Sequence, residues 1–137
     1  MIKIEGIDHI VLRTGQIDAM LAFYIDLLGC TLERDTGPET GLVQLRAGNA
    51  LIDIVRVDSE LGRVGGGVPT EKDNNLDHLC LRLEPISEQA LGDYLKSAGV
   101  AMSSFEERYG AEGFGPSVYI QDPDGNTVEL RSALDKN

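Results

Sequence analysis

The only two histidines of the chain lie in two copies of one short motif. The first copy reads Ile7-Asp8-His9-Ile10-Val11-Leu12-Arg13 and the second reads Leu76-Asp77-His78-Leu79-Cys80-Leu81-Arg82. Both follow the pattern apolar-Asp-His-apolar-x-Leu-Arg, and the offset between the histidines (78 minus 9, or 69 residues) is close to half of the 137-residue chain. A repeat of this length predicts two similar supersecondary units.

A carboxylate also recurs near the end of each half. Asp53 and Glu129 each follow a Gly-Asn turn and stand in an aliphatic run. Two imidazoles and two carboxylates suit a divalent first-row metal ion: zinc, nickel, cobalt, manganese or ferrous iron. This ligand set does not select one of these metals. A single histidine in a strand is more often a core or surface residue, but its repetition with a matching carboxylate favours a metal site.

The pattern around these residues predicts an α+β fold made of two tandem βαβββ modules. Module one covers residues 4–58, a connector covers 59–75, and module two covers 76–131 of a single domain, 1–137. Side chains alternate along a strand. The two histidines and two carboxylates therefore fall opposite the aliphatic faces that should meet the helices. Together the modules should form a curved eight-stranded mixed sheet around a metal-binding cleft.

Each module is expected to contain one helix followed by three strands. In module one the helix should span 16–28, with strands over 31–36, 41–46 and 50–58. In module two the helix should span 87–98, with a strand over 100–106 and a hairpin of 117–121 and 126–131. The glycine-rich stretch 108–116 is expected to be a loop.

Bulk properties exclude several classes of partner. The chain has 12 basic and 23 acidic residues, a net charge of −11, which disfavours nucleic acid and anionic membrane surfaces. No apolar run approaches the roughly 18 residues of a membrane span. The N-terminus lacks the long apolar stretch of a signal peptide, and two scattered cysteines do not make a disulfide framework. We therefore expect a cytoplasmic protein with a small-molecule substrate.

Four motifs resemble the vicinal oxygen chelate superfamily, which includes glyoxalase I, extradiol dioxygenases, fosfomycin-resistance enzymes and bleomycin-binding proteins. The similarity extends over residues 4–131. It is carried by the two Asp-His strands, by Phe23-Tyr24-Ile25-Asp26-Leu27-Leu28-Gly29, and by the run from Val118 to Leu130 that contains Asp122-Pro123-Asp124-Gly125-Asn126. These motifs are specific for the superfamily and not for one reaction.

The resemblance implies metal ligands from the first and fourth strands of each module. They fall on His9, His78 and Glu129, which match in type, and on Asp53, where glyoxalase I has glutamate. Aspartate is one methylene shorter, so the alternative is a site of two histidines and one carboxylate, which ferrous dioxygenases also use.

The resemblance also points to residues that would bind substrate. Arg13 falls where small glyoxalases bind a carboxylate of glutathione, although the asparagine that partners it there is replaced near Val57. Tyr119 should point into the cleft, and Arg82 could hold an anion or pair with a surface acid. Cys80 faces the cleft as a small filler.

The function implied first is a metal-dependent lyase or isomerase of glyoxalase type. Glu129, and Asp53 second, would act as general base while the metal stabilises an enediolate. One alternative is an extradiol-type dioxygenase or another reaction on the same metal platform. The other is a non-catalytic module that binds a small molecule or an antibiotic. Superfamily members of this size often form homodimers, and a homodimer is expected here.

Overall fold

A computed structural model describes residues 1–70, 72 and 74–134 of the chain, and these divide into two compact units between Thr70 and Glu71. Residues 71 and 73 of the expected connector lie outside the described residues. Each unit is built from one four-stranded mixed sheet and its helices. None of the helices in the described part of the chain is long and apolar enough to cross a bilayer.

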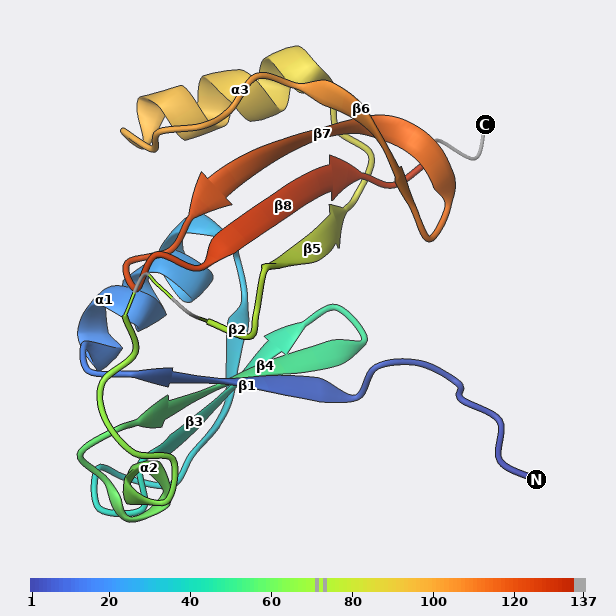
Figure 1. The fold of residues 1–137 in the computed structure, drawn as a ribbon. Coiled ribbons are helices and arrows are strands. Elements are labelled where there is room, and N and C mark those ends of the chain that lie inside the picture. The colour runs from blue at the N-terminus through green and yellow to red at the C-terminus, as the bar shows by residue number, and fades with distance from the viewer. Residues whose placement is uncertain (71, 73, 135–137) are drawn as a thin grey trace. The chain divides into compact units, whose positions relative to one another are not determined.

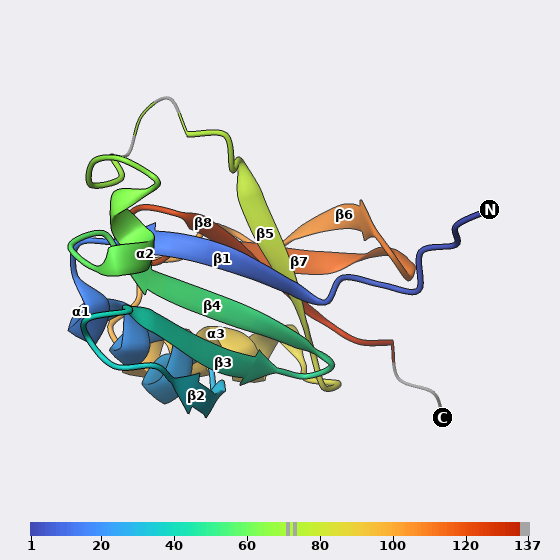
Figure 2. The ribbon, with the colours of Figure 1, turned by 90° about the horizontal axis from the view of Figure 1, so that it is seen from below.

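The first unit follows the predicted strand, helix, three-strand order. Its strands are β1 (His9–Thr14), β2 (Thr31–Asp35), β3 (Leu42–Ala47) and β4 (Ala50–Arg56), and its helices are α1 (Ile17–Leu21), the π-helical η1 (Ala22–Leu27) and α2 (Glu60–Arg63). The strand order is β1-β4-β3-β2, as Figure 2 shows. The first and fourth strands are parallel neighbours, while β4 pairs with β3 and β3 with β2 in antiparallel fashion.

The second unit repeats this topology. It contains β5 (His78–Leu83), α3 (Glu88–Ser97), β6 (Glu106–Gly110), β7 (Gly113–Gln121) and β8 (Thr127–Ser132). The order is β5-β8-β7-β6, again with first and fourth strands parallel, and Figure 1 shows β7, β8 and β5 side by side. The prediction of an α+β fold with two βαβββ modules is therefore confirmed, with the eight strands arranged as two four-stranded sheets.

In both units one face of the sheet is aliphatic and buried, as alternation along the strands requires. The buried side chains of the first unit include Met20 and Tyr24 from the helical segment with Leu45, Ile52 and Ile54 from the strands. Those of the second include Leu91 and Leu95 from α3 with Val118, Ile120, Val128 and Leu130. The opposite face carries His9 and Asp53 beside Val11 and Val55 in the first unit, and mainly polar side chains in the second.

The expected helix over 16–28 is present but changes its winding halfway. After one turn of α1 the chain widens into η1, where the Leu28 amide donates to the Phe23 carbonyl five residues earlier at 3.0 Å. Gly29, in the left-handed region with φ 83°, ends the segment as predicted. The connector holds an unpredicted element, the short helix α2, whose N-cap Ser59 accepts a hydrogen bond from the Gly62 amide.

The expectation of a strand over 100–106 and a loop over 108–116 is wrong. Most of the supposed loop is a hairpin, with β6 starting at Glu106 and β7 at Gly113. The glycines at 110 and 115 are explained by β8, because the Arg131 side chain of that strand occupies the space that a larger residue would need. A Cβ on Gly110 would lie 2.1 Å from Arg131 Nη1, and one on Gly115 would lie 2.9 Å from Nη2. These glycines accommodate a guanidinium and do not signal irregular chain.

Candidate functional site

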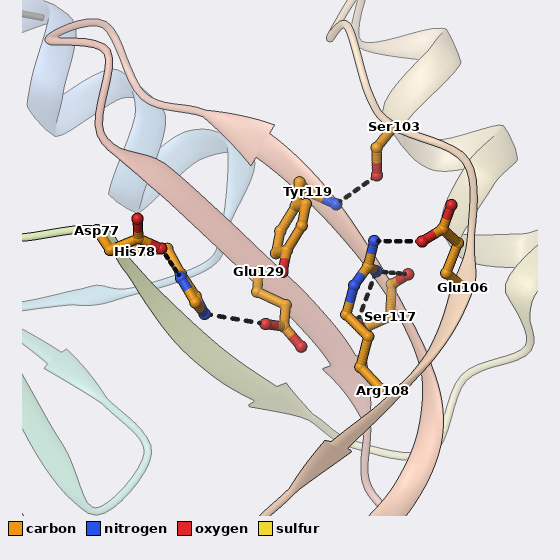
Figure 3. Close-up of polar contacts among 8 residues, drawn as sticks. All are labelled: Asp77, His78, Ser103, Glu106, Arg108, Ser117, Tyr119 and Glu129. Atoms are coloured by element: carbon orange, nitrogen blue, oxygen red, sulfur yellow. Dashed lines mark hydrogen bonds and ion pairs between the residues drawn. The ribbon is translucent and has the colours of Figure 1, made fainter.

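The second unit brings one predicted histidine and one predicted carboxylate into direct contact. His78 begins β5 and Glu129 lies in the neighbouring β8, which places both on the polar face of the sheet. His78 Nε2 is 3.2 Å from Glu129 Oε1 (Figure 3). The glutamate side chain is 7% exposed, whereas that of the histidine is 34% exposed. A buried carboxylate is thus covered by an imidazole that solvent can reach.

The other ring nitrogen of His78 is occupied by the preceding residue of the repeated motif. His78 Nδ1 lies 2.7 Å from Asp77 Oδ2, so a proton on Nδ1 is held by that carboxylate. In a neutral ring Nε2 then carries a lone pair, which would repel the Glu129 carboxylate. The contact is therefore favourable when a proton or a metal ion lies between the imidazole and the carboxylate. A carboxylate on the far nitrogen is also the usual support of a metal-binding histidine.

The first unit carries the equivalent residues in a different arrangement. His9 Nδ1 is 2.6 Å from Asp8 Oδ1, which repeats the Asp77–His78 contact. This hydrogen bond raises the pKa of His9 most, and the charges of Asp53 and Asp8 add to it against the opposing effect of desolvation. Asp53 is buried in β4, and its Oδ2 accepts a hydrogen bond from Gln44 Nε2 at 3.1 Å. Asp53 Oδ1 is buried and accepts no hydrogen bond within the described part of the chain.

Each unit by itself supplies two side chains of types that can ligate a divalent metal ion. Among the described residues of either unit, no three His, Cys, Asp or Glu side chains gather closely enough to hold a metal ion. Each unit instead supplies one imidazole supported by an aspartate and one buried carboxylate. The unpartnered Oδ1 of Asp53 is costly to bury unless a cation or a donor reaches it.

Two arginines predicted to bind substrate are held by protein groups. Arg13 donates from Nη1 to the Gly67 carbonyl at 3.0 Å and from Nη2 to the carbonyls of Gly62 and Gly66 at 3.0 and 2.6 Å. Arg82 Nη1 lies 3.3 Å from Glu112 Oε2. Arg13 therefore fixes the stretch that follows α2, and a role of either arginine in substrate binding stays a prediction.

Tyr119 lies on the polar face, directly opposite Glu129 in the β7–β8 pair, as alternation predicts. Its ring packs edge-on against His78, with 5.6 Å between centroids. Its other side contacts Arg108, whose Cζ is 4.1 Å from the ring centroid. Figure 3 shows His78, Glu129, Tyr119 and Arg108 following one another across the sheet. Sequence reasoning missed Arg108 because the residue was assigned to a loop.

Cys80 also lies on this face, paired with Glu129 in the register of β5 and β8. Burial of the thiol, and next the negative charge of Glu129, raise its pKa to about 11. A thiol with so high a pKa is almost fully protonated at neutral pH and is a poor nucleophile. The residue as a whole is exposed, and its role as a small filler stays a prediction.

Comparison with known proteins finds a dioxygenase and a virulence protein among the relatives of this chain. Biphenyl-2,3-diol 1,2-dioxygenase 3 of Rhodococcus globerulus is 31% identical over 133 residues, and the alignment covers 90% of this chain and 60% of that protein. The chain thus spans less than two thirds of the dioxygenase. A virulence protein of Salmonella typhimurium is 27% identical, with 93% and 83% of the two chains covered.

A solved structure from the mobile metagenome of V. pseudocholerae shares the fold over almost its whole length. It has a TM-score of 0.74 and 25% identity, and the superposition covers 98% of this chain and 99% of that one. The family model of the Glyoxalase/Bleomycin resistance protein/Dioxygenase superfamily matches residues 6–130. The chain, with its paired βαβββ units and its doubled histidine and carboxylate, belongs to this superfamily.

Proposed function

We propose that the protein is a metal-dependent enzyme that acts on a small substrate with two vicinal oxygens, and that its reaction is a lyase or isomerase reaction of glyoxalase type. The proposed ligands of one divalent ion are His9, His78, Glu129 and Asp53. The metal is zinc, nickel, cobalt, manganese or iron, and the donor types do not select among these.

The observation that carries this proposal is the contact between His78 Nε2 and Glu129 Oε1 at 3.2 Å, with Asp77 on the opposite ring nitrogen. This contact is favourable when a cation or a proton lies between the two groups. The first unit repeats the supported histidine, and Asp53 Oδ1 adds a buried carboxylate oxygen without a donor. Four such groups match the donor chemistry of a first-row divalent metal.

When bound, the ion would polarise a substrate carbonyl and stabilise the enediolate that forms after proton removal. Glu129 is the proposed general base, because one of its oxygens lies beside His78 while its side chain is shielded from water. It would take a proton from one carbon and return it to the adjacent carbon. Tyr119, across from Glu129, would cover one side of the substrate and exclude water from the proton transfer.

The second candidate is a ring-cleaving dioxygenase. It is favoured by the 31% identity to a biphenyl-2,3-diol dioxygenase. A dioxygenase would need two histidines and one carboxylate, with Asp53 outside the coordination sphere. Asp53 Oδ1, which is buried without a hydrogen-bond donor, supports the four-ligand site and hence the lyase or isomerase.

The decisive experiment measures metal content and turnover on the same preparation. Protein purified without chelator or metal-affinity resin should contain close to one divalent ion per chain, and His78→Ala should lose it. A panel of hemithioacetals, acyl-CoA esters and catechols should then be assayed with and without oxygen. Turnover that persists without oxygen supports the lyase or isomerase, and turnover of a catechol that stops without oxygen supports the dioxygenase.

Full turnover by metal-depleted protein would contradict both candidates. A binding module without catalysis would show ligand affinity, no stoichiometric metal and no product. Light scattering of the same preparation tests the proposed homodimer, for which a mass of twice 14.8 kDa is expected.

A further inference from the structure

Arg108 is a residue of the second unit to which the proposed chemistry assigns no role. It lies in β6 opposite Gly115 of β7, so its side chain is on the same face as Ser117, Tyr119 and Glu129. Because one tyrosine ring contacts both His78 and Arg108, the imidazole and the guanidinium are separated by little more than that ring. A small molecule bound beside His78 and Glu129 could therefore reach Arg108.

The guanidinium is fixed from two sides. Arg108 Nη1 donates to the Ser117 carbonyl at 2.8 Å and to Ser117 Oγ at 3.0 Å, and the plane of Tyr119 lies against Cζ. The side chain is 19% exposed. A guanidinium that is held in place but still partly open loses little entropy on binding a further acceptor.

The remaining contact of Arg108 is a weak one with an acidic group. Arg108 Nη2 lies 3.3 Å from Glu106 Oε2, and the Glu106 side chain is 63% exposed (Figure 3). Exposed ion pairs of this kind contribute little to stability. Glu106 can thus swing into solvent and leave Nη2 to another carboxylate, whose bond to a guanidinium would be charge-assisted.

The two other arginines of this face are less suited to an incoming anion. Arg82 faces Glu112, whose side chain is 27% exposed and less free to leave. Arg131 is buried against the glycines of the β6–β7 hairpin, where Nη2 donates to the Gly113 carbonyl and Nη1 is shielded. An acceptor could reach Arg131 only by displacing the hairpin.

We propose that Arg108, framed by Tyr119 and Ser117, is a specificity-determining residue that binds a carboxylate of the substrate. The substrates would then be vicinal dioxygen compounds that carry an acid group, and Glu106 would occupy the carboxylate position while the site is empty. This inference rests on the proposed function, because the vicinal oxygens are assigned to the metal.

The test compares probes that share the vicinal oxygens and differ in the acid group. Calorimetry on the full-length, zinc-loaded protein would give dissociation constants for catechol, 3,4-dihydroxybenzoate and 3,4-dihydroxyphenylacetate. Zinc has no redox chemistry, so ring cleavage does not interfere. At least one acid should bind about tenfold more tightly than catechol.

Two variants change this preference in opposite directions. Arg108→Gln should abolish the preference and leave the catechol constant within about twofold, whereas Glu106→Gln should tighten acid binding by about two- to fivefold by removing the competing carboxylate. Arg56→Gln is the matched control. Arg56 forms an ion pair with Asp58 in the first unit, on the face of the sheet opposite to Asp53. Its replacement removes one positive charge and should change the dissociation constants of neither catechol nor the acids.

The outcomes separate this inference from the proposed function. Equal affinities for catechol and both acids, or a preference for acids that survives Arg108→Gln, would overturn the role of Arg108 and leave the metal proposal standing. Unchanged acid affinity in Glu106→Gln would contradict the competing carboxylate. If no probe binds the zinc-loaded protein, the proposed function fails and this inference fails with it.

Discussion

The two units use the same strand pair to hold a histidine and a carboxylate, yet only one unit joins them. In the second unit Glu129 reaches His78 at 3.2 Å. In the first unit Asp53 is hydrogen-bonded to Gln44, and its influence on His9 is electrostatic. The side chain of aspartate is one methylene shorter than that of glutamate, which gives Asp53 less reach toward the strand that carries its histidine. Asp53 bonds instead to Gln44 in β3, on the other side of β4.

The residue that faces each carboxylate from the neighbouring antiparallel strand also differs between the units. Gln44 faces Asp53 in the β3–β4 pair, and Tyr119 faces Glu129 in the β7–β8 pair. Gln44 donates to Asp53 and accepts from Arg34 Nε at 2.6 Å, which makes a hydrogen-bonded chain across the first sheet. Tyr119 instead stacks under Arg108. The first unit therefore holds its carboxylate with a neutral amide, whereas the second places its carboxylate against an imidazole.

The largest effect is expected when the carboxylate of each unit is removed in turn and the metal affinities of the two variants are compared. Glu129→Gln should weaken zinc or manganese binding by at least about 100-fold, since it removes the carboxylate that is proposed to share a cation with His78. Asp53→Asn should weaken it by about tenfold, because Gln44 already engages one oxygen and only Oδ1 is open. Calorimetric metal titrations measure both constants.

Glu106→Gln serves as the control for loss of one negative charge and should leave metal affinity unchanged. If Asp53→Asn proved as damaging as Glu129→Gln, the units would contribute equally, and the contrast drawn from their geometry would be wrong.

A pair of glycine substitutions tests why the β6–β7 hairpin of the second unit contains glycine at position 110. Gly110→Ala should lower the free energy of unfolding by about 1–3 kcal/mol, because its Cβ would meet the buried Arg131 Nη1 at 2.1 Å. Gly92→Ala should raise it by about 1 kcal/mol, because Gly92 lies within α3 and its Cβ would make ordinary contacts, the nearest being 3.7 Å from Phe105. Urea unfolding gives both values.

Arg131→Ala in the Gly110→Ala background should recover part of the loss, as expected for two residues in contact. A purely additive result would mean that backbone conformation, and not the guanidinium, explains the glycine.

This hairpin also shows where sequence reasoning ends. The repeat predicted the four strands that carry His9, Asp53, His78 and Glu129, because apolar and polar residues alternate clearly in them. It did not predict β6, because Gly110, Gly113 and Gly115 read as a loop when Arg131 is not known to lie above them. Local composition cannot report a side chain that arrives from a strand more than a dozen residues away. Arg108 was missed for the same reason.

The predicted metal ligands show a second limit of sequence reasoning. Alternation along each strand predicted the face on which each of these side chains lies, and both units place them there. Which carboxylate contacts its histidine depends on side-chain reach and on distances between strands that a pattern does not contain. The assignment of all four residues to one ion stays a prediction.

The two serine N-caps offer a smaller contrast between the units. Ser59 is buried, accepts from the Gly62 amide at 3.0 Å and donates to the Arg56 carbonyl at 2.5 Å. Ser87 accepts from the Ala90 amide at 3.1 Å at an exposed helix end. Ser59→Ala should therefore cost about 2 kcal/mol of unfolding free energy and Ser87→Ala about 0.5–1 kcal/mol, since water can replace the exposed cap. Equal losses in urea unfolding would show that burial does not strengthen the first cap.

The smallest expected effect concerns the pKa values of the two cysteines, which differ because only Cys80 lies near the charge of Glu129. Burial raises the pKa of both thiols, but for Cys80 the negative charge of Glu129 adds to burial and brings the pKa to about 11. In Glu129→Gln the charge is removed while burial remains, so the Cys80 pKa should fall modestly and the thiolate fraction at pH 8 should rise.

Because thiolate is the reactive form, metal-free Glu129→Gln protein should react with iodoacetamide at Cys80 about two- to fivefold faster than the wild type. Peptide mass spectrometry over a time course measures this rate, and the rate at Cys30, where burial alone raises the pKa, should stay constant. A slower reaction at Cys80 would mean that the carboxylate activates the thiol as a base, contrary to the electrostatic effect described above.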